Sequence, residues 1–193
     1  MKVIPLSDDE KRILLQLARL CIERAVKQQP LPEVLLENYP ENLRADGASF
    51  VTLTKHGHLR GCIGALEAYQ PLVQDVCEHA VAAALEDYRF PPVQPEEVDQ
   101  LCIEISRLTP PQPLTYTRPE ELLAALRPGV DGVVLRDGIR RATFLPQVWE
   151  KVPDKADFLS QLCLKMGAAP DTWRRKALQV SLYQVEEFSE SHL

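Results

Sequence analysis

The most constraining feature of this sequence is an order of local patterns that occurs twice along the chain. In the first half, residues 50–64 contain two strand-like runs around a turn at Gly57. A helical spacing of apolar residues follows from Leu72 to about Asp87, and residues 101–108 then alternate between apolar and polar side chains. Two strands, a helix and a further strand predict an antiparallel sheet with a helix against one face.

The second half of the chain shows the same order. Residues 132–145 form another hairpin signal, because Asp137-Gly138 suits the tight turn between antiparallel strands. A helical pattern over 158–166 ends before Gly167, and residues 178–182 alternate again. The second half therefore repeats the order of hairpin, helix and strand.

Together these patterns predict an α+β fold with a largely antiparallel sheet and flanking helices. The length of 193 residues suits one domain or two tightly joined subdomains. The correspondence between about 50–108 and 132–186 suggests an internal ββαβ duplication inside a single domain over 1–193. Ahead of it, Ser7 and Glu10 have the spacing of a capping box, so a helix is expected from there to about residue 28.

The charge balance argues against a nucleic-acid partner. The 193 residues contain 22 Lys plus Arg and 28 Asp plus Glu, a net charge of −6, whereas binding to phosphate backbones relies on clustered basic side chains. The dense basic spots, Arg140-Arg141 and Arg174-Arg175-Lys176, are not interleaved with base-stacking aromatics. We interpret both as solvated faces.

Hydropathy and cysteine usage indicate the compartment. No run of about 18 apolar residues occurs, and the N-terminal segment is acidic where a signal peptide would be apolar. The five cysteines are odd in number and form no CxxC pair. We therefore expect a cytoplasmic protein with reduced thiols and no membrane partner.

The segment Leu59-Arg60-Gly61-Cys62-Ile63-Gly64 is the richest in chemistry. In a regular strand, Arg60 and Cys62 share one face while Leu59 and Ile63 point into the core. A guanidinium beside a thiol favours the nucleophilic thiolate. This segment by itself nevertheless favours a buried, inert cysteine, because free cysteine is among the most buried residue types. The glycine at 61 either opens access to the thiol or lets another backbone approach closely.

Two further positions could complete a site. Glu104 lies mid-strand and could pair with Arg60, act as a general acid or base, or simply face solvent. Asp87 and Arg89 lie in a stiff aromatic bend with Phe90, where they could anchor an anionic substrate group or form a local salt bridge.

Metal and nucleotide chemistry have little support. His56, His58 and Cys62 read H-x-H-x-x-x-C, which is not a recognised zinc spacing, so no metal is expected. His79 is either a packed core histidine or a base for Cys62. Because the sequence lacks nucleophile-elbow, dinucleotide-binding and P-loop motifs, no cofactor is expected either.

Four motifs together resemble the AMMECR domain family, whose prokaryotic members are called AmmeMemoRadiSam system protein A. They are Leu59-Arg60-Gly61-Cys62-Ile63-Gly64, Asp87-Tyr88-Arg89-Phe90-Pro91-Pro92-Val93, Ile103-Glu104-Ile105-Ser106 and Phe144-Leu145-Pro146-Gln147-Val148. The resemblance implies a two-subdomain α+β fold with a cleft near the first motif. It also implies two partners, a Memo-like protein and a radical S-adenosylmethionine enzyme. The site positions that it implies are Arg60, Cys62, Asp87, Arg89, Phe90, Glu104 and Lys165.

These observations lead to two functional hypotheses. The first is a cysteine-dependent enzyme, or enzyme component, of a radical-chemistry modification pathway that acts on a small-molecule or peptide substrate. In it, Cys62 is the thiolate, Arg60 stabilises it, and Glu104 orients Arg60 or moves a proton. The alternative is a non-catalytic module that uses the same cleft to present a substrate or dock a partner enzyme.

Overall fold

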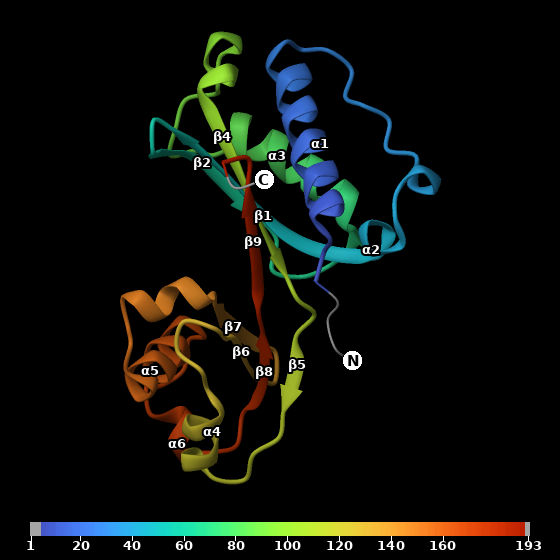
Figure 1. The fold of residues 1–193 in the computed structure, drawn as a ribbon. Helices are drawn as coiled ribbons and strands as arrows, with labels where there is room; N and C mark the ends of the chain where they lie inside the picture. Colours follow the sequence, from blue (N-terminus) through green and yellow to red (C-terminus); the bar gives the residue numbers. More distant parts are fainter. Residues whose placement is uncertain (1–4, 192–193) are drawn as a thin grey trace. The chain divides into compact units, whose positions relative to one another are not determined.

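A computed structural model describes residues 5–191, and its chain divides into two compact units (Figure 1). The first unit comprises Met1–Leu108 and Glu186–Leu193, and the second comprises Thr109–Val185. Helices and antiparallel strands occur in both units, so the predicted α+β class is confirmed. None of the helices within residues 5–191 has both the length and the apolar character needed to cross a membrane.

The first unit holds a five-stranded sheet with two main helices. The sheet has the strand order β2-β1-β4-β9, and the short β3 also pairs with β1. The elements of this unit are α1 (Asp8–Val26), η1 (Leu36–Asn38), α2 (Glu41–Arg44), β1 (Asp46–Lys55), β2 (His58–Gly64), β3 (Gln70–Pro71), α3 (Leu72–Leu85), η2 (Pro95–Gln100), β4 (Leu101–Leu108) and β9 (Val185–Ser189).

The start of α1 is fixed by the capping box predicted from the sequence. The backbone N–H of Glu10 donates to Ser7 Oγ at 3.2 Å, and the backbone N–H of Ser7 donates to Glu10 Oε2 at 2.8 Å. These bonds satisfy two donors that a helix start would otherwise leave without partners. The helix therefore begins where the sequence indicates.

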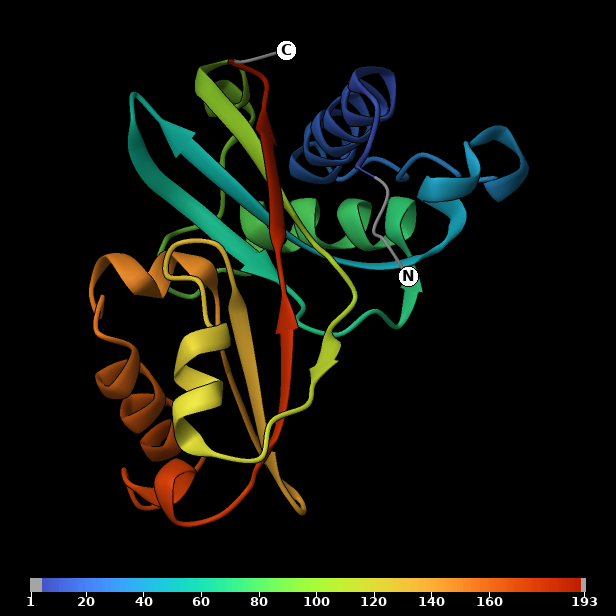
Figure 2. The same ribbon diagram turned by 60° about the horizontal axis from the view of Figure 1, so that its bottom comes forward.

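The core of the first unit lies between its sheet and the helices α1 and α3, which Figure 2 shows on the same side of the sheet. From the sheet, Val51 and Leu53 of β1 and Ile103 and Ile105 of β4 are almost fully buried. The expected alternation is observed from Leu101 to Ile105, with these apolar side chains turned toward the helices, and it is interrupted at Ser106, which is also buried.

The second unit has its own sheet and core. Its sheet order is β5-β8-β6-β7. The core includes Trp149 and Phe158, whose stacked rings have centroids 3.6 Å apart. The elements are β5 (Gln112–Leu114), α4 (Pro119–Ala125), β6 (Gly132–Asp137), β7 (Arg140–Phe144), η3 (Pro146–Glu150), α5 (Lys155–Lys165), α6 (Thr172–Arg175) and β8 (Gln179–Tyr183).

The two units share a ββαβ topology, and the strand that follows each ββαβ segment joins the sheet of the other unit. In each unit a hairpin is followed by a helix and a strand that pairs with the first strand of the hairpin: β1-β2-α3-β4 in one, β6-β7-α5-β8 in the other. The strand after β4 is β5, which joins the second sheet, and the strand after β8 is β9, which joins the first. Whether the two halves arose by duplication stays a prediction.

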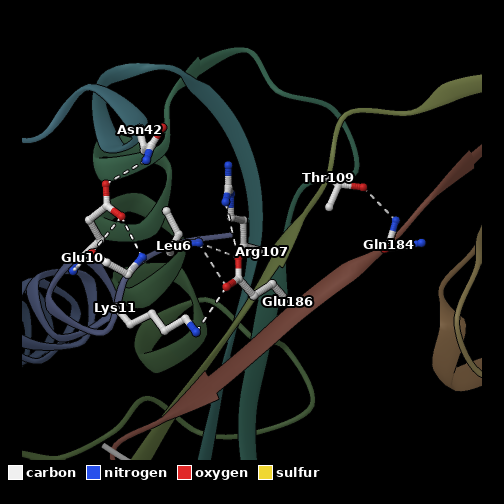
Figure 3. Close-up of polar contacts among 9 residues, drawn as sticks. Leu6, Glu10, Lys11, Asn42, Arg107, Thr109, Gln184 and Glu186 are labelled. Atoms are coloured by element: carbon white, nitrogen blue, oxygen red, sulfur yellow. Dashed lines mark hydrogen bonds and ion pairs between the residues drawn. The ribbon is translucent and has the colours of Figure 1, made fainter. Parts of the chain in front are cut away.

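Polar contacts mark the places where the chain passes from one unit to the other (Figure 3). Within the second unit, the N–H of Gln184 donates to Thr109 Oγ1 at 2.8 Å, and the N–H of Thr109 donates to the Gln184 carbonyl at 2.8 Å. Within the first, Glu186 accepts from Lys11 and Arg107 at 3.2 and 3.3 Å. Strand β9 is thereby tied to the start of α1 and to β4.

The prediction that all five cysteines are reduced is wrong for two of them. Cys21 of α1 and Cys77 of α3 form a disulfide, with their Cα atoms 5.9 Å apart. Cys62, Cys102 and Cys163 are free thiols. The pairing depends on the packing of α1 against α3, which spacing along the chain does not reveal.

We expect this disulfide to stabilise the first unit, because it closes a long loop of 56 residues in the unfolded chain. A reducing agent should lower the free energy of unfolding by about 2–4 kcal/mol, measured by urea denaturation. The double variant Cys21→Ser/Cys77→Ser should not respond to the reductant. A wild type that also fails to respond would contradict a stabilising disulfide.

Candidate functional site

The candidate site is centred on a row of three side chains across the sheet of the first unit. Thr52 of β1 lies opposite Cys62 of β2 on one side and opposite Glu104 of β4 on the other. The Thr52 hydroxyl donates to Cys62 Sγ at 3.3 Å. All three residues are partly exposed. Cys62 and Glu104, both predicted from the sequence, thus share a face with Thr52 between them.

The opposite face of the same strands is covered by α3. Gly61 lies opposite the buried Leu53, and a Cβ atom at position 61 would lie only 2.1 Å from the carbonyl oxygen of Ala83. The glycine therefore lets α3 approach the strand closely, which is one of the two roles expected for it. Cys62 is consequently held on the face turned away from this helix.

A β-bulge alters the alternation predicted for Leu59 and Arg60. The register shifts between Leu53 and Thr54, so Thr54 lies opposite Leu59 while Leu53 lies opposite Gly61. Arg60 is the extra residue of the bulge. Residues of β2 before Arg60 therefore point to the opposite face from the one that a regular strand would give them. Leu59 is 44% exposed, so the expectation that it points into the core is wrong.

Arg60 is engaged by a carboxylate other than Glu104. Its Nε and Nη2 atoms donate to the two carboxylate oxygens of Glu97 in η2, at 3.3 and 3.0 Å. Lys55 Nζ lies 2.9 Å from the same carboxylate. These bonds, chiefly those from Arg60, lower the pKa of Glu97 to about 2. Arg60 Nη1 is buried and has no hydrogen-bond partner among the residues described.

Asp87 and Arg89 clamp the backbone of Cys62. The buried Asp87 carboxylate accepts the Cys62 N–H at 2.9 Å and two bonds from the Arg89 guanidinium at 2.9 and 2.6 Å. Arg89 Nη2 also donates to the Cys62 carbonyl at 3.3 Å. The Arg89 hydrogen bonds hold the pKa of Asp87 far below its usual range, against the opposing effect of burial.

This geometry corresponds to the local salt bridge that was one of the two alternatives for Asp87 and Arg89. The Arg89 side chain is nonetheless 43% exposed, so its guanidinium reaches solvent beside the cysteine. Its central carbon lies 5.5 Å from the centre of the Phe90 ring. Arg89, rather than Arg60, is therefore the cation in contact with the Cys62 main chain.

Lys165 belongs to the second unit, unlike the other predicted site residues. Its Nζ donates to the Thr143 carbonyl at 2.9 Å and lies 5.1 Å from the centre of the Phe144 ring. These contacts hold the end of α5 against β7. They give Lys165 a local structural role within its own unit.

The histidines have separate environments. His56 and His58 are exposed at the β1–β2 turn, and within residues 5–191 no group of three or more His, Cys, Asp or Glu side chains is placed to hold a metal ion. His79 is a buried residue of α3 whose Nδ1 lies 3.2 Å from Asp75 Oδ2, which also accepts a 2.6 Å bond from Ser49. This matches the core-histidine alternative.

Sequence reasoning missed Thr52 and Glu97. Thr52 carries no motif of its own, and its contact with Cys62 follows only from the strand register. Glu97 did offer a local signal, because it lies three residues after Gln94 and accepts the Gln94 N–H at 3.0 Å as a helix start requires. That signal locates η2 but does not reveal Arg60 as a partner.

Comparisons with known proteins identify the family. The AMMECR1 family model matches residues 15–188. A protein of Methanothermobacter thermautotrophicus is 42% identical over 194 residues, which cover 98% of this chain and 99% of that protein. Protein MJ0810 of Methanocaldococcus jannaschii is 35% identical over 94% of this chain and 90% of its own length. The chain belongs to the AMMECR1 family, as its four motifs indicate.

A solved structure supports the same assignment. The crystal structure of uncharacterized protein PH0010 from Pyrococcus horikoshii matches this fold with a TM-score of 0.79 and 35% sequence identity. The match covers 97% of this chain and 94% of that one. The similarity therefore extends over both units of the fold.

We expect Asp87→Asn to destabilise the protein by about 2–3 kcal/mol at neutral pH, because a buried carboxylate loses charge-assisted hydrogen bonds. The contribution of Asp87 is complete above the unfolded-state pKa of about 3.9 and is lost as the pH falls toward the lower folded-state value. Urea denaturation at several pH values should therefore show a difference from wild type that shrinks below that pH. Asp171→Asn, at an exposed ion pair with Arg175, is the control and should have little effect.

Gly61→Ala should also destabilise the protein, because its Cβ would overlap the Ala83 carbonyl oxygen. A cost of about 1–3 kcal/mol is expected, since backbone atoms of α3 must shift. Thermal denaturation measures the cost. An unchanged melting temperature would show that α3 does not approach β2 as closely as described.

Proposed function

We propose that this protein is a cysteine-dependent enzyme, or the thiol-bearing component of one, with Cys62 as its reacting group. The observation that carries the proposal is the placement of a free, partly exposed thiol beside a hydroxyl donor and in one row with a carboxylate. The Thr52 hydroxyl is placed to donate a hydrogen bond to the sulfur atom while it reacts.

Glu104 is the group proposed to move a proton in this row. It lies two strands from Cys62 with Thr52 between them, and neighbouring strands are about 4.8 Å apart. At this spacing the Glu104 carboxylate does not need to contact Cys62 Sγ directly. A substrate atom or a water molecule above Thr52 lies within reach of both ends of the row.

Arg89 supplies the positive charge at the site and takes the role first assigned to Arg60. Its guanidinium is partly exposed and fixed by Asp87, so it can hold an anionic group of the substrate without a large loss of side-chain entropy. The proposed substrate is a small molecule or peptide with a carboxylate or phosphate close to the reacting atom.

The family resemblance supplies the proposed context. A Memo-like protein and a radical S-adenosylmethionine enzyme are the proposed partners, in a radical-chemistry modification pathway. In such a system the Cys62 thiolate would displace a leaving group from an activated substrate, and that group would depart with the electron pair of the broken bond. An acceptor nucleophile would then attack the group bound to sulfur and release Cys62 as the thiolate.

The alternative is a binding module without catalysis. Its support is that most hydrogen bonds of Asp87 and Arg89 are internal, which is typical of a rigid binding loop. The two functions differ in the demand that they place on the thiol. An enzyme of the proposed kind needs a reactive Cys62, whereas a binding module does not.

We expect Cys62 to react with iodoacetamide faster than Cys102, which is also free and partly exposed. Cys163, buried in the second unit, should be protected, and its burial raises the pKa of its thiol. Thr52→Val should slow alkylation of Cys62 by about two- to tenfold, the equivalent of one hydrogen bond of about 0.5–1.5 kcal/mol. Site-resolved mass spectrometry at neutral pH measures all three thiols in one sample.

Thr54→Val is the matched control, because Thr54 lies on the same strand and face but opposite Leu59. It should leave the Cys62 rate unchanged. Equal rates for Cys62 and Cys102, together with no effect of Thr52→Val, would rule out a tuned nucleophile and favour the binding module.

A further inference from the structure

A groove in the first unit reaches one of the two disulfide-bonded cysteines. It has a volume of about 470 Å³, and its walls are formed by side chains of α3 and of the connection after α1. Cys77 lines it, together with the apolar Leu31, Val34 and Val81 and the acidic Glu78 and Glu86. The disulfide is thus adjacent to a space that can hold a small molecule.

The two cysteines differ in their exposure, and of the two Cys77 lines the groove. Cys77 retains 7% of its exposure, whereas Cys21 is completely buried among the core residues of α1. Thiol–disulfide exchange requires that a thiolate approach one sulfur atom along the disulfide bond. Cys77 is therefore the sulfur that can be attacked in the folded protein, with Cys21 as the leaving group.

We propose that Cys77 is a site of thiol–disulfide exchange with low-molecular-weight thiols that carry a positive charge or none. The groove accommodates the incoming thiol, and its carboxylates select against an anionic one. This reactivity is separate from that of Cys62, which is a free thiol on β2.

The exchange is a balanced reaction. The incoming thiolate forms a new bond to Cys77 Sγ, the bond to Cys21 breaks, and Cys21 leaves with the electron pair as a thiolate and takes up a proton. A second thiolate then attacks the sulfur of the first thiol. This step releases the Cys77 thiolate and a small-molecule disulfide, so that two thiols are oxidised while the protein disulfide is reduced.

The electrostatic selection rests on Glu78 and Glu86. The hydrogen bond from Gln70 at 2.6 Å and that from Tyr69 at 3.0 Å lower the pKa of Glu78, so it is ionised at neutral pH. The described residues that line the groove include no lysine, arginine or histidine. A lining with two carboxylates and no basic side chain repels an anionic thiolate and attracts a cationic thiol.

The test uses the 193-residue chain with its partly exposed free thiols, Cys62 and Cys102, first blocked by N-ethylmaleimide. The protein is then incubated separately with cysteamine, 2-mercaptoethanol and glutathione at equal thiolate concentrations. Acid quenching, intact-mass measurement and peptide mapping locate the mixed disulfide. The expected adduct is on Cys77, with rates that rise linearly with thiol concentration and follow the order cysteamine, 2-mercaptoethanol, glutathione.

The double variant Glu78→Gln/Glu86→Gln is the matched test of selection. It should reduce the cysteamine-to-glutathione rate ratio by about threefold or more, because two charges near the reacting sulfur are removed. 2-Mercaptoethanol, which is neutral as a thiol, shows whether the groove still admits a ligand. A ratio that does not change would overturn the electrostatic selection.

Further outcomes would overturn the exchange site itself. One is an adduct on Cys21, because that sulfur has no access in the folded protein. Another is a rate that does not depend on thiol concentration and equals the rate of unfolding, which would mean that the disulfide reacts only in opened molecules. An intact mass that shows five free thiols before reduction would also exclude the proposal.

Discussion

The buried carboxylate of Asp87 connects the end of α3, strand β2 and the side chain of Arg89. The candidate site depends on these three parts keeping their positions. Asp87 lies just after α3, and its carboxylate accepts the backbone N–H of Cys62 in β2. The same carboxylate binds the guanidinium of Arg89, two residues further along the same loop. Burying a charge is costly unless it is paired and hydrogen-bonded, and here the partners belong to the site. The position of the Cys62 main chain is therefore fixed by electrostatics as well as by the sheet ladder.

Helix α3 supports several features at once. Its buried positions include Cys77 of the disulfide, the Asp75–His79 pair and Ala83, whose carbonyl lies against Gly61. These contacts attach α3 to α1, to its own preceding turn and to strand β2. One helix thus carries both the disulfide-bonded Cys77 and the backbone against which the strand of Cys62 packs.

Much of the fold could be predicted from local patterns, because a helix start or hairpin turn is decided by residues close in sequence. Ser7 and Glu10 located the start of α1, and Asp137-Gly138 located the β6–β7 turn. The site was harder, since the bulge at Arg60 reverses the faces of β2 and no local signal reports it. Thr52 lies in the same hairpin as Cys62, but their contact depends on a strand register that the sequence does not show. Cys21 and Cys77 are 56 residues apart, and their pairing depends on how α1 packs against α3.

The first sheet receives its edge strand β9 from the end of the chain, and this affects the order in which the two units can fold during synthesis. The second unit is one continuous segment, Thr109–Val185, inserted between β4 and β9 of the first. The first sheet must wait for its last strand until the ribosome has made the whole second unit. Until then, β4 keeps an unpaired edge, and Arg19, which binds Glu190 at 2.5 Å, lacks its carboxylate. The N-terminal unit of this protein is thus the last to be completed.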